Sequence, residues 1–169
     1  MWQGEGLDRL LDAAHAGLVD RVVELLRAND WQVIPEATFN IYGERGSIDI
    51  LAFHPASGSL LIVEVKSVVP DMQGLLASLD RKDRLARQIA GMHTWSPRSI
   101  SRLIVLPEDR TARRRVTEHA ATLDAAYPDR TIAVRRWLRD PEGRISGLVF
   151  VSGAKRAATR HRLRMRRAA

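Results

Sequence analysis

Three charged residues interrupt two apolar runs near the middle of the chain. Asp49 lies in the run 48–53, and Glu64 and Lys66 lie at the end of the run 60–65. Both runs are rich in β-branched and apolar residues, and the segment HPASGS between them is turn-forming, so the pair predicts a β-hairpin. Because side chains alternate along a strand, Glu64 and Lys66 share one face and are neighbours.

The register of this hairpin decides whether Asp49 joins them. If the turn closes with Phe53 opposite Leu60, Asp49 lies opposite Glu64, with Cβ atoms about 5 Å apart. A two-residue shift would pair Asp49 with Lys66 and keep all three on one face. A one-residue slip would separate them, but it would also turn every apolar side chain over, so the pattern disfavours it.

Two facing carboxylates repel unless one is protonated or a cation lies between them. A divalent ion resolves the conflict, and oxygen ligands without cysteine suit Mg²⁺ or Mn²⁺ rather than zinc. A water on that ion can become a nucleophile, and Lys66 adds a positive charge that polarises the water or stabilises charge on a phosphate. Of 27 lysines and arginines only three are lysines, which favours a specific need for an amine at Lys66. An ordinary ion-pair cluster on a half-exposed sheet is the alternative.

The sequence Gly-Ser-Ile-Asp49, a short hairpin and then Glu64-Val-Lys66 resembles the PD-(D/E)xK superfamily of restriction-endonuclease-like nucleases, which includes archaeal-type Holliday junction resolvases and small bacterial proteins related to them. The resemblance covers roughly residues 7–106, and Ile48 replaces the proline that precedes the aspartate in the family. It implies that Asp49 and Glu64 bind catalytic Mg²⁺ and that Lys66 assists attack on a phosphodiester. Many relatives act as dimers, so it also admits a homodimer.

The resemblance further implies an acid from the first helix, for which Asp20 fits best and Glu24 is the substitute. Asp20 lies opposite the apolar stripe of that helix, so a solvated surface position is the alternative. Glu36 and Glu44 could each approach the metal from its far side, and Glu44 is the better candidate because it lies beside the glycines that enter the hairpin; the default interpretation of both is a surface acid. The five histidines are scattered and show no metal-ligand spacing.

Several polar residues after the hairpin are candidates for contacts with a nucleic-acid backbone. Gln73 and Lys82 lie on the helix that follows the E-x-K strand, where relatives carry such a contact. Arg113, Arg114 and Arg115 begin a later helix, where they oppose the helix dipole unless a phosphate, or solvent and salt, relieves the conflict. A charged outer face is the alternative for all five residues.

The remaining patterns predict an α/β domain over residues 1–152, with a mixed central sheet flanked by helices and extra C-terminal strands. The resemblance implies that the core of this domain is restriction-endonuclease-like. Asp71 is the expected N-cap of the second helix. The predicted helices are 7–27, 71–92 and 111–126, and the predicted strands outside the hairpin are 31–42 (interrupted near Pro35, at an edge or a bulge), 101–106, 131–138 and 145–151.

The charge of the chain is concentrated at its end. The formal net charge is +7, and residues 153–169 carry seven basic residues and no acid. This predicted flexible tail fits either a DNA partner gripped through its phosphates or a solubilising terminus. The absence of cysteine, of an apolar run of membrane-spanning length and of a basic leader predicts a cytoplasmic protein without a membrane partner.

The sequence therefore predicts a metal-dependent nuclease that hydrolyses DNA phosphodiester bonds. The main alternative is a catalytically inactive nuclease-fold module that binds nucleic acid in a regulatory or defence role. A protein-interaction domain of a defence or toxin system is a third hypothesis.

Overall fold

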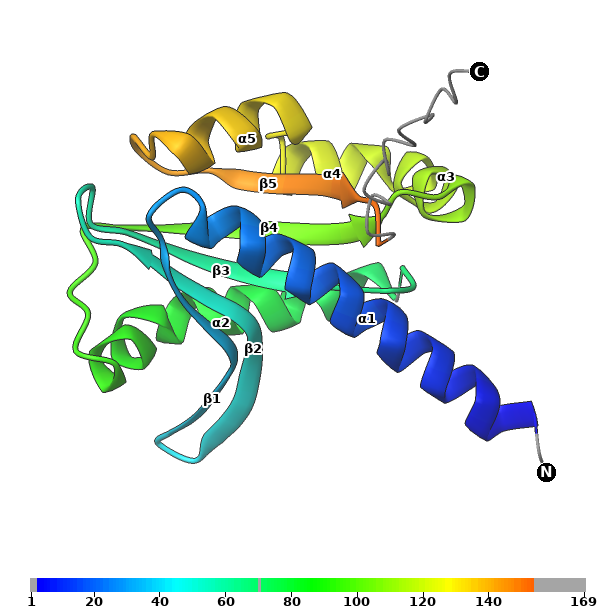
Figure 1. Cartoon of the computed structure of the whole chain (residues 1–169), viewed down its shortest axis with the longest axis horizontal. Helices are drawn as coiled ribbons and strands as arrows, with labels where there is room; N and C mark the ends of the chain where they lie inside the picture. Colours follow the sequence, from blue (N-terminus) through cyan, green and yellow to red (C-terminus); the bar gives the residue numbers. More distant parts are fainter. Residues whose placement is uncertain (1–2, 70, 154–169) are drawn as a thin grey trace, which may run out of the picture.

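The computed structural model describes residues 3–69 and 71–153, and the predicted basic tail beyond Gly153 lies outside this range. Five strands form one sheet in the order β1-β2-β3-β4-β5, antiparallel from β1 to β3 and parallel from β3 to β5 (Figure 1). This confirms an α/β fold with a mixed sheet flanked by helices. The elements are α1 (Gln3–Arg27), β1 (Gln32–Ile41), β2 (Glu44–His54), β3 (Ser59–Val65), α2 (Met72–Met92), β4 (Ser99–Pro107), α3 (Arg110–Glu118), α4 (Ala120–Ala126), α5 (Thr131–Arg139) and β5 (Ser146–Val151).

Helices cover both faces of the sheet. One face packs against α1 and α5 through residues such as Leu18, Val22 and Trp137, and the other packs against α2, α3 and α4 through residues such as Leu79 and Leu123. Every residue of β3 is buried as a result. A strand that is covered on both faces is usually apolar along its whole length. Glu64 is the exception in β3, because it is a charged residue in the interior of the domain.

The hairpin has the first of the two registers that the apolar pattern allows, not the two-residue shift. Phe53 lies opposite Leu60, and the pairing of β2 with β3 continues as far as Ile50 and Val63. The predicted edge position of β1 is also confirmed, because β1 is the first strand of the sheet and, among the described residues, pairs with β2 alone. The irregularity near Pro35 falls on Glu36, which has a φ of 49° and interrupts the pairing of β1 with β2 between Pro35 and Ala37.

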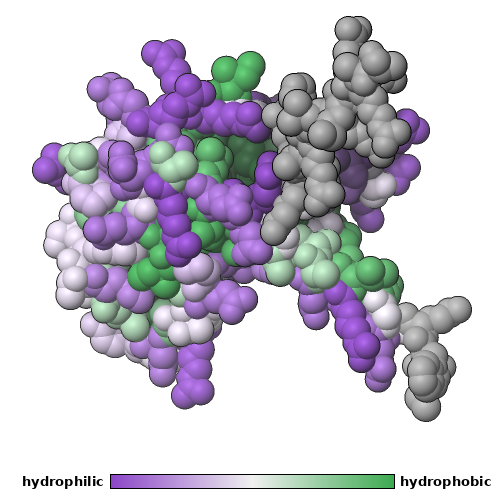
Figure 2. All heavy atoms as spheres, viewed as in Figure 1, coloured by the Kyte–Doolittle hydropathy of each residue, from purple (hydrophilic) through white to green (hydrophobic). Residues whose placement is uncertain are grey.

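The helix α2 follows the predicted limits closely, whereas α1 begins at Gln3, four residues before the predicted start, and ends at Arg27 as predicted. Asp71 caps α2 by accepting a hydrogen bond from the backbone N–H of Gly74 (2.9 Å), and the helix ends at Met92. The C-terminal half of α1 packs on the sheet, whereas its N-terminal half stands clear of the body with Leu7 and Leu10 exposed (Figure 2). Within residues 3–69 and 71–153 no helix, α1 included, combines the length and the apolarity needed to cross a bilayer.

Two predicted elements are wrong. Residues 131–138 form the helix α5, not a strand: the β-branched residues suggested a strand, but Val134, Trp137 and Leu138 have the i, i+3, i+4 spacing of a helix and are buried together against the sheet. The predicted helix 111–126 is broken at His119, whose φ of −112° ends α3 and allows α4 to start in a new direction.

Candidate active site

The two carboxylates lie where β2 and β3 separate. The backbone ladder between these strands ends one residue before Asp49 and Glu64 would pair. Beyond that point, the Asp49 side chain provides the hydrogen-bond acceptor in place of the β2 backbone: its Oδ2 accepts a hydrogen bond from the backbone N–H of Val65 (2.7 Å). The two carboxylates are close enough for the charge of Glu64 to raise the pKa of Asp49.

Glu64 is held by two lysines. Its Oε1 lies 2.8 Å from Nζ of Lys66, and its Oε2 lies 2.5 Å from Nζ of Lys82. The side chains of Glu64 and Lys82 are only 4% and 6% exposed, whereas that of Lys66 is 33% exposed. Lys82 therefore neutralises the Glu64 carboxylate from within the domain, and the Lys66 amine lies at the boundary between this buried carboxylate and solvent.

The position of Lys82 corrects a prediction. Lys82 was expected on the surface of α2, either as a phosphate contact or as part of a charged outer face, but the structure places it in the interior. It follows Leu75 and Leu79 at intervals of four and three residues, so it lies on the apolar stripe that α2 turns toward the sheet. That spacing was the signal for its burial, and only a buried acid makes such a position tolerable for a lysine.

The environment of Asp49 raises the pKa of its carboxyl group. Burial is the largest cause and the charge of Glu64 the next, while the Val65 N–H, Lys66 and His15 act in the opposite direction. The ionised carboxylate is thus disfavoured in the folded protein. A cation between Asp49 and Glu64 would remove this penalty.

Asp49→Asn is therefore expected to stabilise the protein at neutral pH in the absence of metal. The folded state holds the Asp49 proton more tightly than the unfolded state, so its contribution to stability is full below the ordinary aspartate pKa and is lost as pH rises through the raised pKa. Asparagine keeps an acceptor for the Val65 N–H but carries no charge. Thermal unfolding in EDTA should show a higher Tm for the variant than for the wild type at pH 7 and a smaller difference at pH 4. A lower Tm at both pH values would contradict this account.

The residue that α1 brings to the site is a histidine. His15 Nε2 lies 3.9 Å from Oδ1 of Asp49. Asp20, the acid expected from this helix, is exposed and lines a hollow beside His15 that also includes Glu36, and no contact of Asp20 with Asp49 is found within the described residues. No spacing in the sequence singled out His15, because its approach to Asp49 depends on how α1 crosses the sheet.

The donor set fits a hard divalent cation, with few protein ligands. Asp49 and Glu64 offer carboxylate oxygens on neighbouring strands where the β2–β3 pairing ends, and Mg²⁺ is commonly held by one or two carboxylates while it keeps several waters. In the part of the chain that the structure describes, no three His, Cys, Asp or Glu side chains converge as a metal cluster. An ion bound by both carboxylates would compete with Lys66 and Lys82 for the oxygens of Glu64.

The expected phosphate contacts have surface positions. Gln73 is exposed on the first turn of α2, and Arg115 is exposed on α3. Arg113 pairs with Glu108 and stacks on the ring of Phe150, with 4.4 Å from its guanidinium carbon to the ring centroid, and Arg114 lies 3.6 Å from Glu118. Asp109 also caps α3, so acids within the chain already offset part of the charge at this helix start. A contact of these residues with DNA stays a prediction.

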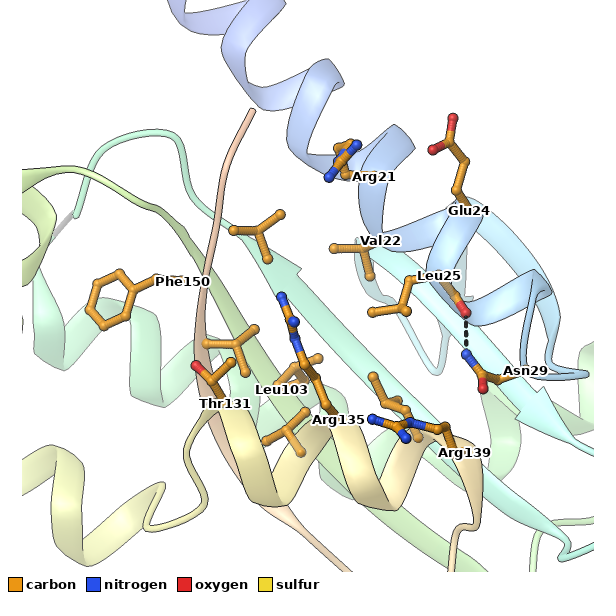
Figure 3. A pocket seen from close by; sticks show the side chains of 14 residues that line it. Arg21, Val22, Glu24, Leu25, Asn29, Leu103, Thr131, Arg135, Arg139 and Phe150 are labelled. Carbon is orange, nitrogen blue, oxygen red and sulfur yellow. Dashed lines mark hydrogen bonds between the residues drawn. The ribbon is translucent and has the colours of Figure 1, made fainter. Parts of the chain in front are cut away.

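A second hollow lies between α1 and α5 (Figure 3). Its floor is apolar, and Arg21, Arg135 and Arg139 lie around it with Glu24 as a single acid. Because this hollow has no pair of carboxylates, it is a weaker candidate for a catalytic site than Asp49, Glu64 and Lys66 at the end of the β2–β3 pairing. The chain matches no protein-family model and no curated protein, so the functional argument rests on Asp49, Glu64 and Lys66 themselves.

Proposed function

We propose that this protein is a metal-dependent nuclease that hydrolyses phosphodiester bonds of DNA. The observation that carries the proposal is the pair of carboxylates, Asp49 and Glu64, at the point where two strands separate, with the Lys66 amine 2.8 Å from Glu64. The mixed sheet, with α1 before the hairpin and α2 between β3 and β4, is compatible with the restriction-endonuclease-like core that the sequence resembles.

Each residue has a distinct role in this proposal. Asp49 and Glu64 would hold Mg²⁺ or Mn²⁺, which when bound supplies an activated water and stabilises negative charge on the phosphate. Lys66 is fixed by Glu64 at the edge of solvent, where its amine can orient the attacking water or donate a hydrogen bond to a phosphate oxygen. Lys82 is a positioning residue that holds Glu64 and compensates its charge.

The alternative is a module that keeps the fold and binds nucleic acid without cutting it. One observation favours it: both oxygens of Glu64 are engaged by lysines, and no third metal ligand joins Asp49 and Glu64 within the described residues. Such a cluster is satisfied without a metal ion.

The test compares the wild type with Asp49→Asn on labelled linear, nicked, branched and single-stranded DNAs in Mg²⁺, Mn²⁺ or EDTA. We expect cutting that requires the metal and the wild-type residue. Because Asp49→Asn is expected to stabilise the fold, its loss of activity would not reflect unfolding. Cutting that persists in EDTA would contradict the proposal, and salt-sensitive binding without any cutting would favour the non-catalytic module.

A further inference from the structure

Tyr42 has an unfavourable backbone conformation at the tip of the β1–β2 hairpin. The hairpin closes through a two-residue loop, with φ of 51° at Tyr42 and 83° at Gly43, and Ile41 pairs with Glu44. Two positive φ values are the pattern of a type I′ turn, which favours Asn, Asp or Gly at its first central position. A tyrosine there is strained, because a side chain disfavours the left-handed region.

This strained residue is also almost completely exposed. The Tyr42 side chain is 96% accessible, and the hairpin that carries it curves away from the rest of the sheet (Figure 1). Packing within the described residues therefore does not explain the aromatic ring. A strained backbone at an exposed aromatic residue points to a contact outside the chain.

The part of the hairpin nearest this ring offers polar, uncharged or basic groups, and the exposed acid Glu36 lies further along β1, beside His15. The cross-strand pairs Asn40 with Arg45 and Thr38 with Ser47 are all exposed. These side chains supply hydrogen-bond donors and a positive charge, and none of them is an acid. Such a surface suits the phosphates and sugars of a nucleic-acid strand.

Alternation along β2 directs this surface toward Asp49. Glu44 pairs with Arg84 of α2, and Ile48 lies in the core cluster on the α2 side of the sheet. The intervening odd-numbered residues, Arg45 and Ser47, therefore lie on the opposite side of the hairpin, the side on which His15 of α1 approaches Asp49. Arg45 and Ser47 thus lie on the side from which Asp49 is approached, whereas Glu64 is buried against Lys82 of α2 on the other side.

We propose that the β1–β2 hairpin is a nucleic-acid-binding arm in which Tyr42 stacks on an unpaired base and Arg45 contacts the backbone of the same strand. The inference rests on the proposed nuclease function and adds a substrate feature to it, an unpaired base near the cleavage site. Asp49 lies seven positions after Tyr42, which is at most about 23 Å along a strand. That length corresponds to about seven nucleotides at about 3.4 Å each.

The experiment uses forked DNA with 2-aminopurine in its single-stranded arm, bound by the full chain in EDTA so that cutting does not consume the probe. Wild type and Tyr42→Phe are expected to quench the fluorescence on stacking and to bind with similar Kd. Tyr42→Asn should abolish the quenching and weaken binding about ten-fold or more. Asn is preferred at this turn position, so the Tm of Tyr42→Asn should equal or exceed that of the wild type, which separates binding from folding.

Ile132→Asn is the matched control, because Ile132 is a large, exposed residue on α5, outside the hairpin. Equal binding and quenching by Tyr42→Asn and the wild type would overturn the arm while leaving the nuclease proposal intact. Binding and quenching that depend on Tyr42, in a protein that cuts no DNA, would support the arm and refute the nuclease. A wild type that binds none of the forked DNA overturns the arm.

Discussion

Lys66→Ala is expected to reduce metal-dependent DNA cleavage by about 10²- to 10⁴-fold, the range associated with loss of a positioned proton-transfer group. The Lys66 amine is partly exposed and fixed 2.8 Å from Glu64, so it is the cation best placed to act on a water or a phosphate oxygen. Glu64 keeps Lys82 as a buried partner in the variant, and the fold should therefore persist. Single-turnover cleavage of labelled DNA, with Tm measured on the same samples, checks both statements.

Lys66→Arg tests whether cleavage requires the amine group of Lys66 or only its positive charge. A guanidinium is planar and remains protonated, so it replaces the charge but neither the shape nor the proton chemistry of an amine. We expect this variant to remain far below the wild type in cleavage rate. Arg84→Ala, which removes an exposed ion pair with Glu44, serves as the control for general loss of positive charge. Full activity of Lys66→Arg would show that charge alone is required.

Lys82→Ala is expected to lower the free energy of unfolding by about 3 kcal/mol, because removing one partner of a buried ion pair leaves the other charge poorly compensated. Glu64 and Lys82 are both almost inaccessible, and Lys66 compensates Glu64 from the solvent side alone. For a chain of this size the loss corresponds to a fall in Tm of roughly 6–12 °C. Thermal and urea unfolding at pH 7 in EDTA would measure it.

Two further variants separate the ion pair from other effects of the substitution. Adding Glu64→Gln to Lys82→Ala removes the uncompensated charge and should recover part of the lost stability. Arg84→Ala lies on the same helix but breaks an exposed pair, and it should change stability by less than about 1 kcal/mol. Similar losses in Lys82→Ala and Arg84→Ala would contradict the assignment of Lys82 as a buried partner of Glu64.

Local sequence patterns determined the hairpin but left two choices for its register. A one-residue slip would turn the apolar side chains over, whereas Phe53 opposite Leu60 and a two-residue shift both satisfy the pattern, and the structure has Phe53 opposite Leu60. The N-cap at Asp71 is also a local feature, since its partner is three residues away. Features of this kind depend on residues that are close together in the chain, so they can be predicted from the sequence alone.

Tertiary packing decided the partners of the carboxylates. Lys82 reaches Glu64, 18 residues away in the sequence, because α2 docks its apolar stripe on the sheet, and His15 reaches Asp49 because α1 crosses the opposite face. The same packing makes 131–139 a helix despite its β-branched residues. Neither helix carries a sequence signal for the angle and position at which it docks, so the sequence alone could identify Asp49, Glu64 and Lys66 but not the residues that surround them.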